Sequence, residues 1–418
     1  MIRSNKEEKQ TANQQLVKES NLSLIFNFIK RYESISRAEL ANITKLSPTT
    51  VSSLVEELLR DGLIVETGFG NSTTSGRKPI MLQINSNGGY IVSIEMMPNL
   101  LNCFIYDLNC RELGGSSFNI SDYGRVGKLI ADAVQSVLEE CKLKEDKLLG
   151  ICIGVPGLID TENNQVVAST IIPLDEENDF FNFVKNKFTD IYVMLGNESC
   201  FYAYAEKEFG IGKDVKNLIF IDINDGIGAG IILNGEIYTG SNGLAGEIGH
   251  MTIDMNGSKC KCGNRGCLEM FASIPAISQK IIFGMMSGWN TKIQGIIGFD
   301  YGKINADIIR LGIDDKDELV IQVIDETAQK LAYGINNIIN FFNPEVIVIG
   351  GEIVKLGEVF LDKIKLYLNN IAFKPNIGKV EIQYSKNHVN ASTMGGAAYV
   401  LDNIFKTGAW EDKGLMNR

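Results

Sequence analysis

The chain has 418 residues and a formal net charge of −11. This length exceeds one ordinary hydrophobic core and predicts two or three domains. An apolar fraction of 44% with 22% charged residues is typical of a globular protein. We find no run of about twenty apolar residues and no leader segment, so the sequence argues against membrane insertion and export. The following cysteines are isolated, as free core thiols of a cytoplasmic protein would be: 103, 110, 141, 152 and 200.

The charge is unevenly distributed. Residues 1–86 carry eleven Lys and Arg against nine Asp and Glu, whereas the remainder has a net charge of −13. An acidic body of this kind needs a specific docking element to approach DNA. The polar first 20 residues predict a mobile arm or a frayed helix.

Signals for three helices follow. Apolar residues recur with helical spacing from Leu22 to about Tyr32. Ser36 precedes a short helix, and Glu39 stands at the spacing of a capping box. Ser47 then caps a helix that has Pro48 at its first position and runs to about residue 61. Two capped helices joined by a short turn are typical of a helix-turn-helix.

Two predicted strands at 62–65 and 79–84 complete a winged helix, with a basic loop between them. The second capped helix presents small hydroxyl side chains on its early turns, as a helix that enters the major groove does. Alternatively, this polar face is only solvated surface, or the module docks a protein. The candidate DNA-contacting residues are Ser47, Thr49, Thr50, Ser52, Ser53, Arg77 and Lys78.

From residue 87 onward a mixed α/β pattern occurs twice. A meander over 89–120 precedes a helix and a buried strand at 148–155, and a second meander over 217–239 precedes several helices and the buried strand Val346–Gly350. Ligands in such sheets bind beyond the carboxyl ends of the strands. The predicted domains are a winged helix-turn-helix at 1–86, a first α/β lobe at 87–200 that is completed by about 385–405, and a second α/β lobe at 201–384.

A cluster of thiols in the second lobe predicts a metal site. Cys260, Cys262 and Cys267 lie within eight residues, and His250, one of two histidines in the chain, lies ten residues upstream. Three thiols and one imidazole form a tetrahedral Zn²⁺ site. Four protein ligands leave no open position, so the ion would be structural.

Acidic residues flank this cluster and suggest a second role. Glu247 precedes the histidine by three residues, and Glu269 follows the last cysteine by two. A metal-bound imidazole keeps one ring nitrogen in a fixed direction, where it can meet a polyhydroxylated ligand between the two carboxylates. The simpler interpretation is a zinc knuckle that only staples a loop.

The pattern Glu-x-Gly-His followed by Cys-x-Cys-Gly-x-x-Gly-Cys-x-Glu resembles the zinc and sugar-binding signature of the ROK family of sugar kinases and sugar-responsive repressors. The resemblance extends from about residue 22 to 400. It implies the actin-like two-lobed ATPase fold of sugar kinases, preceded here by a winged helix-turn-helix. It also implies that Asn197 and Glu198 join Glu247, His250 and Glu269 around a monosaccharide.

Three departures from the kinase pattern suggest that phosphoryl transfer has been lost. The first phosphate turn, Asp-x-Gly-x-Thr in the family, corresponds to Glu95–Asn99, without glycine or threonine. The second turn, usually Gly-Thr-Gly, is Asn224-Asp225-Gly226, where a carboxylate would repel phosphate. The catalytic aspartate of Asn-Asp is replaced by Glu198.

Together with the N-terminal module, these departures are similar to the xylose-repressor branch. The resemblance implies a repressor of sugar-utilisation genes that binds a palindromic operator as a homodimer, or as a dimer of dimers, and responds to a monosaccharide such as xylose. The alternatives are an active ATP-dependent, glucokinase-like sugar kinase with an accessory winged helix, and a zinc-stabilised scaffold whose winged helix binds protein.

Overall fold

In the computed structural model, the structure describes residues 4–69, 78–161, 163–169, 171–174, 177–371, 373, 378–386 and 390–406. The chain divides into two compact units. The first comprises Met1–Gly154, Asp179–Leu195 and Gly396–Arg418, and the second comprises Val155–Asn178 and Gly196–Gly395. Among the described residues, no helix has the length and apolarity needed to cross a membrane.

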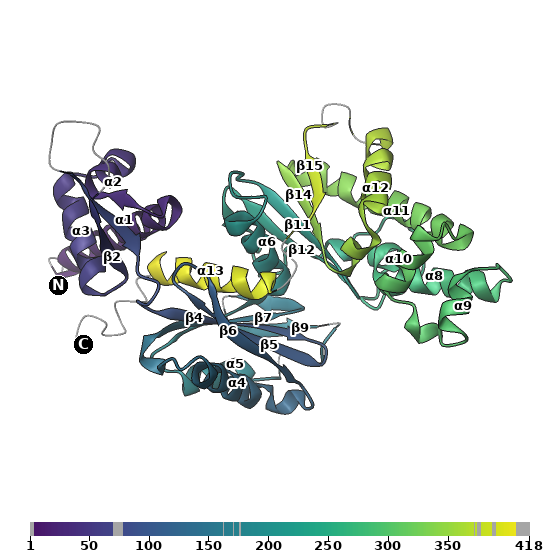
Figure 1. The fold of residues 1–418 in the computed structure, drawn as a ribbon, viewed down its shortest axis with the longest axis horizontal. Coiled ribbons are helices and arrows are strands. Elements are labelled where there is room, and N and C mark those ends of the chain that lie inside the picture. Colours follow the sequence, from purple (N-terminus) through teal and green to yellow (C-terminus); the bar gives the residue numbers. More distant parts are fainter. Residues whose placement is uncertain are drawn as a thin grey trace. The chain divides into compact units, whose positions relative to one another are not determined.

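The first unit begins with the three predicted helices (Figure 1). Helix α1 (Ser4–Tyr32) starts well before Leu22. Of the two predictions for the polar first residues, an arm or a helix, the structure shows a helix from Ser4 onward. Ser36 and Glu39 form the predicted capping box at the start of α2 (Arg37–Thr44). The Ser47 hydroxyl accepts a hydrogen bond from the Thr50 N–H at 3.1 Å and caps α3 (Pro48–Arg60). Both predicted caps are confirmed.

A three-stranded sheet completes the winged helix, in the order β1-β3-β2. Strands β2 (Ile64–Phe69) and β3 (Ile80–Ile84) are the predicted wing strands and pair antiparallel. The sequence did not predict β1 (Ile35–Ser36), because two residues are too few to show alternation.

The first α/β lobe is built on a five-stranded sheet in the order β10-β7-β4-β5-β6. Strands β4, β5 and β6 form an antiparallel meander, and β7 pairs parallel to β4. Helix α13 lies over one face of this sheet, and α4 and α5 lie over the other (Figure 1). The bounds are β4 Tyr90–Met97, β5 Leu100–Asp107, β6 Glu112–Asn119, α4 Val126–Glu140, β7 Leu148–Val155, α5 Phe180–Lys187, β10 Tyr192–Asn197 and α13 Ala391–Lys406.

The second unit repeats this plan with the order β13-β12-β11-β14-β15. Strands β11, β12 and β13 form the antiparallel meander, and β14 and β15 extend the sheet in parallel. The predicted repetition of a mixed α/β lobe is confirmed. The bounds are α6 Glu198–Phe209, β11 Leu218–Ile223, β12 Ile227–Leu233, β13 Glu236–Ile237, α7 Glu269–Ala272, α8 Ile274–Met286, α9 Ile293–Ile297, α10 Ala306–Asp314, α11 Glu318–Phe342, β14 Val346–Gly350, α12 Glu358–Ile371 and β15 Glu381–Tyr384.

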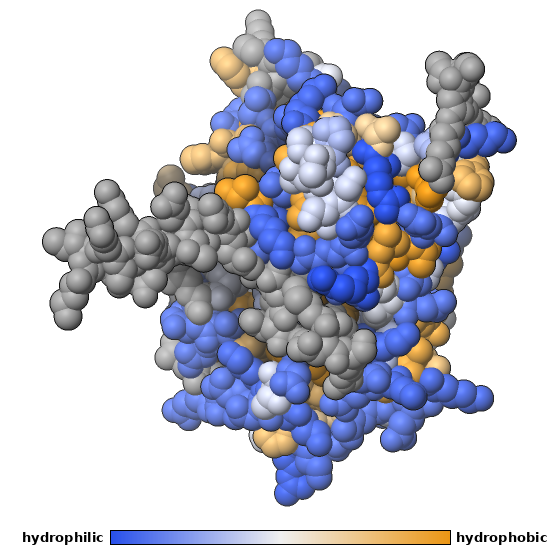
Figure 2. Space-filling view, turned by 90° about the vertical axis from the view of Figure 1, so that its left-hand side faces the viewer, coloured by the Kyte–Doolittle hydropathy of each residue, from blue (hydrophilic) through white to orange (hydrophobic). Residues whose placement is uncertain are grey.

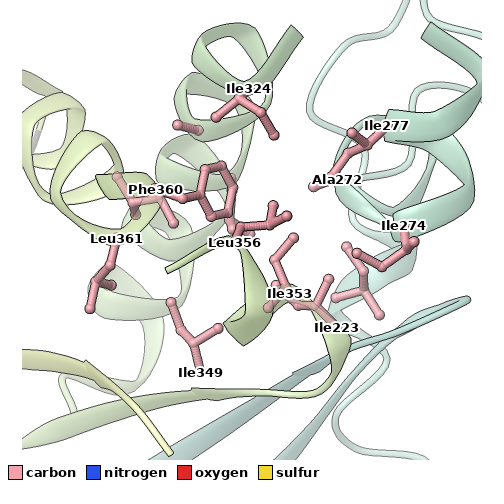
Figure 3. Packing of buried hydrophobic residues seen from close by; sticks show 14 of the residues in the cluster. Ile223, Ala272, Ile274, Ile277, Ile324, Ile349, Ile353, Leu356, Phe360 and Leu361 are labelled. Atoms are coloured by element: carbon pink, nitrogen blue, oxygen red, sulfur yellow. The ribbon is translucent and has the colours of Figure 1, made fainter. Parts of the chain in front are cut away.

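Alternation along β11 explains why helices cover both faces of this sheet. Ile221 and Ile223 belong to one hydrophobic core with residues of α8, α11 and α12. Figure 3 shows Ile223 among these side chains. Phe220 points to the opposite face, where its ring stacks on Tyr202 of α6 at 5.3 Å. Helix α6 is therefore fixed against the sheet, and its first residues lie beside the strand ends.

Candidate functional site

The four predicted metal ligands come together in the second unit. His250 lies on the short 3-10 helix η3 (Ile248–His250), and the loop that follows brings the three cysteines back to it. His250 Nδ1 is 3.7 Å from Cys260 Sγ, and Cys262 Sγ is 3.7 Å from Cys267 Sγ. A tetrahedron with metal–sulfur bonds of about 2.3 Å has edges of about 3.7 to 3.8 Å. The cluster therefore has the size and the donor set to hold a metal ion.

The electrostatics of the cluster also favour a cation at its centre. Burial, followed by the neighbouring thiols, raises the pKa of Cys267 to about 12. A hydrogen bond from the Asn264 N–H lowers the pKa of Cys262. A cation at the centre would stabilise the thiolate of Cys267 against this rise in its pKa.

Backbone geometry closes the loop that carries the cysteines. The Leu268 N–H donates to the Met251 carbonyl at 2.9 Å, so the two ends of the loop pair. Gly266 has φ +65°, and a Cβ there would overlap the carbonyl oxygen of Asp254. A glycine is therefore required just before Cys267, as the spacing of the motif indicates.

The second ring nitrogen of His250 points away from the cysteines and toward a carboxylate. His250 Nε2 is 3.8 Å from Glu247 Oε2. Burial raises the pKa of Glu247, the imidazole opposes this shift, and the carboxylate of Glu269 adds to it. With Nδ1 facing the sulfurs, Nε2 is left to act as a donor beside Glu247.

Glu269, the first residue of α7, lies near the start of β12. Its Oε2 accepts a hydrogen bond from the Ile227 N–H at 3.3 Å. A Cβ added at Gly226 would lie 3.0 Å from the same oxygen, so glycine leaves space in front of this carboxylate.

Asn197 and Glu198 reach the same strand from α6. The Asn197 side chain caps α6 by accepting from the Ser199 N–H at 2.9 Å, and its Nδ2 donates to the Gly157 carbonyl at 2.9 Å. A Cβ at Gly228 of β12 would lie 3.0 Å from the Ser199 hydroxyl. Glu247, His250 and Glu269 thus lie near the start of β12, and Asn197 and Glu198 lie at the beginning of α6, the helix that packs on this strand. We call these five predicted residues the β12 corner: Asn197, Glu198, Glu247, His250 and Glu269.

The sequence did not predict one neighbour of this corner, the hairpin of β8 (Leu158–Asp160) and β9 (Gln165–Ala168). It packs in the second unit, where a Cβ at Gly243 would overlap the carbonyl oxygen of Ile159. Ile171, just after the hairpin, places its Cδ1 3.7 Å from the Cβ position of Gly226. The local signals for the hairpin are Pro156-Gly157 just before it, where Gly157 has φ +142°, and Asn163-Asn164 in its turn, where Asn164 has φ +53°.

The turn between β11 and β12 is filled by its own side chains. Asn224 Nδ2 donates to Asp222 Oδ2 at 2.9 Å, and Asn224 Oδ1 accepts from the Glu352 N–H at 2.7 Å. A Cβ at Gly351 would lie 2.7 Å from Asn224 Oδ1. We call Asp222, Asn224 and Glu352 the Asn224 turn. The N–H of Glu352, which directly follows Gly350-Gly351 at the end of β14, therefore already has a hydrogen-bond partner in Asn224.

The other predicted phosphate turn, between β4 and β5 in the first unit, is a tight hairpin. Glu95 is buried and accepts from Asn102 Nδ2 at 3.3 Å. The Tyr123 hydroxyl donates to the carbonyls of Met97 and Pro98, at 3.2 and 2.9 Å. Two carbonyl oxygens of this turn therefore face the Tyr123 hydroxyl.

On the winged helix, the predicted DNA-contacting residues differ in availability. The hydroxyls of Ser47 and Thr50 are 2.8 Å apart and are used in capping α3. Thr49, Ser53 and Lys78 are exposed, Ser52 is half-buried, and Arg77 lies outside the described residues. Hydrophilic residues predominate on the face seen in Figure 2, with small hydrophobic areas between them. Thr49 and Ser53, one turn apart, are therefore the hydroxyls of α3 most available to a ligand.

Comparison with known proteins places this architecture in a class. The ROK family profile matches residues 112–403, and a winged helix-turn-helix DNA-binding profile matches residues 19–65. The chain therefore belongs to the ROK family and carries an N-terminal winged helix-turn-helix DNA-binding domain. The predicted fold class, a sugar-kinase-like α/β fold preceded by this module, is confirmed.

Among its relatives are repressors of similar length. The chain is 32% identical over 396 residues to a putative xylose repressor of Caldicellulosiruptor sp. (strain Rt8B.4), covering 94% of this chain and 98% of the relative. It is 31% identical over 404 residues to the xylose repressor of Bacillus subtilis (strain 168), with the same coverage. A crystal structure of a ROK family transcriptional regulator, a homologue of the E. coli MLC protein, superposes with a TM-score of 0.84 at 27% identity, covering 96% of this chain and all of the other. The predicted similarity to the xylose-repressor branch is confirmed.

Proposed function

We propose that this protein is a sugar-responsive transcriptional repressor that binds operator DNA through α3 and the wing, binds a monosaccharide at the β12 corner, and does not phosphorylate it. The observation that carries the proposal is a combination of three features in one chain. They are a winged helix, a β12 corner whose hydrogen-bond donors and acceptors suit sugar hydroxyls, and an Asn224 turn whose polar groups are bonded to one another. Operator binding would take place in the cytoplasm, as the cysteine pattern predicts.

The β12 corner suits vicinal hydroxyl groups. The carboxylates of Glu198, Glu247 and Glu269 are acceptors, and His250 Nε2 is a donor whose direction a bound metal would fix. A carboxylate–hydroxyl hydrogen bond is charge-assisted and contributes about 1.5 to 3 kcal/mol. Asn197 is better understood as a positioning residue, because its side chain already caps α6 and contacts the loop at Gly157.

We propose Zn²⁺ as the metal on His250, Cys260, Cys262 and Cys267. Three thiolates and an imidazole within 4.8 Å of one another match the soft, tetrahedral preference of this ion. Bound there, Zn²⁺ would supply rigidity and not an activated water, since four protein ligands complete its shell.

The absence of kinase activity is supported at two turns. Asn224 occupies the Glu352 N–H that a phosphate oxygen would need, and Asp222 adds a negative charge beside it. At the β4–β5 hairpin, the buried carboxylate of Glu95 is a further negative charge. Transfer of a phosphoryl group depends on N–H donors and cations around the phosphates, and the described parts of these turns offer carboxylates instead.

Xylose, or a related pentose, is the effector that the relatives favour, because both repressors compared above are named for xylose. We also propose that the protein binds a palindromic operator as a homodimer, because the two winged helices of a two-fold symmetric dimer each contact one of two symmetric half-sites. The domain boundaries that we propose are 1–86 for the winged helix, 87–200 with about 385–405 for the first lobe, and 201–384 for the second.

Two assays test the proposal. Calorimetric titration with xylose should show binding to the zinc-loaded protein and a loss of binding in Glu247→Ala; unchanged affinity in that folded variant would remove the corner as the site. A coupled ADP-release assay with a panel of pentoses and hexoses should show no turnover. A rate of about 1 per second, which is normal for a kinase, would establish the kinase alternative.

A further inference from the structure

The last helix, α13, belongs to both units. The boundary between the units falls between Gly395 and Gly396, inside the helix Ala391–Lys406. Its first residues are therefore part of the unit that carries the β12 corner, and the remainder is part of the unit that carries the winged helix.

At its beginning, α13 packs tightly on α6. A Cβ at Gly395 would overlap the carbonyl oxygen of Phe201 and lie 2.9 Å from the N atom of Ala205. Ser392 and Thr393 are also buried, each 1% exposed. Because α6 starts at Glu198 in the β12 corner, a ligand that shifts the start of α6 also shifts the first turn of α13.

At its end, α13 holds the first helix of the winged helix. The Phe405 ring stacks on Phe26 of α1 with ring centroids 3.9 Å apart, and both side chains are fully buried. One turn earlier, Asp402 Oδ1 is 3.7 Å from Lys30 Nζ, and neither side chain is more than 13% exposed. On its other side, α13 packs on the sheet, where a Cβ at Gly150 of β7 would lie 3.0 Å from Ile404 Cδ1.

Helix α1 is in turn fixed to α3, the helix that we propose contacts DNA. Lys18 of α1 pairs with Glu57 of α3 at 2.7 Å, and Glu57 is buried. Val51 and Leu54 of α3 are buried in the same module. A displacement of α1 by α13 therefore carries α3 with it.

The glycine pair marks the position at which α13 can bend. Glycine inside a helix is less favourable than alanine, and kinks occur at such positions. The close contact with Phe201 explains why residue 395 has no side chain. The next residue, Gly396, is where the first unit resumes, so the glycine pair lies at the boundary between the two units.

We propose that α13 is the element that transmits occupancy of the β12 corner to the winged helix, bending at Gly395-Gly396 and acting on α1 through Phe405 and Asp402. The proposal rests on the proposed function for its signal, but the Phe26–Phe405 contact can be tested without sugar or DNA.

The test uses the full-length, zinc-loaded protein. We compare Phe405→Ala with the matched control Phe283→Ala, which removes an exposed ring of α8 in the second unit. In the proposed mechanism, Phe405→Ala keeps its xylose affinity within about 2-fold, whereas the change of operator affinity on adding xylose falls from about 5-fold or more to below 2-fold. Phe283→Ala keeps the full response. A folded Phe405→Ala variant that also keeps it would overturn the proposal.

Hydrogen exchange provides a readout that does not require a folded variant. Xylose added to the unaltered protein should change amide protection in residues 17–32 of α1, and unchanged protection there, despite calorimetric binding, overturns the proposal. If no sugar binds, the proposed function has failed. The Phe405 contact is then tested alone: exchange in α1 should be several-fold faster in Phe405→Ala than in Phe283→Ala, and equal rates contradict it.

Discussion

The β12 corner and the Asn224 turn are neighbours at the start of β12, and they use polar side chains in opposite ways. At the corner, Glu247 Oε2 and His250 Nε2 face each other at 3.8 Å, which is longer than a direct hydrogen bond. At the turn, Asn224 bonds to Asp222 and to the Glu352 N–H, and these groups satisfy one another. The corner therefore keeps its donors and acceptors apart, whereas the turn pairs them, which is the difference that the proposed sugar binding without phosphoryl transfer requires.

The largest effect should follow from breaking the metal cluster on which the corner depends. Cys267→Ser should release the metal and weaken xylose binding more than 100-fold, because His250 then loses its fixed direction. Metal analysis and calorimetry on the same sample check this. Cys141→Ser, which alters a thiol outside the cluster, should keep both metal and sugar; retention of tight sugar binding by metal-free Cys267→Ser would contradict the account.

A smaller effect is expected when one acceptor of the corner is changed. Glu269→Gln keeps the size of the side chain but removes its charge, and should weaken xylose binding about 10- to 100-fold, which corresponds to the 1.5 to 3 kcal/mol of a charged hydrogen bond. The exposed carboxylate of Glu318, on α11, provides the control variant Glu318→Gln, whose affinity should be unchanged. Equal affinities for the two variants would exclude Glu269 from the site.

The winged helix allows a third test, since we propose that sugar and DNA bind to different parts of the chain. Lys78→Ala should weaken operator binding several-fold and lower the slope of log affinity against log salt by about 1, with xylose affinity unchanged. Fluorescence anisotropy across a salt series measures this slope. Lys303→Ala, in the second unit, should leave it as it was, and the idea fails if the two lysine variants behave alike.

The smallest effect should come from opening the Asn224 turn. Asn224→Gly removes two side-chain hydrogen bonds, one half-buried and one exposed, and should lower the free energy of unfolding by about 1 kcal/mol while leaving xylose affinity within about 2-fold. Thermal melts with and without MgATP check whether the freed Glu352 N–H now accepts phosphate. A shift by MgATP that is already present in the unaltered protein would show that the turn was never closed.

Local signals made much of this structure predictable. The caps at Ser36 and Ser47, and the thiol spacing from Cys260 to Cys267, depend on neighbours a few residues away, so the sequence displays them directly. The repeated lobe follows from strand alternation and buried runs. What the sequence did not show depends on distant contacts.

Two long-range contacts illustrate this limit. Asn224 meets the Glu352 N–H across 128 residues, and no local pattern announces that pairing. The β8–β9 hairpin follows β7 in the chain but packs in the second unit, against the segment around Gly243. Only the folded sheet brings these groups together.

The most direct test of the central claim is the affinity of the zinc-loaded protein for its own upstream operator, measured with and without xylose. We predict a change of about 5-fold or more, which corresponds to a coupling free energy of at least about 1 kcal/mol. An operator affinity that is identical in the presence and absence of xylose, at a sugar concentration that saturates the site by calorimetry, would contradict the account.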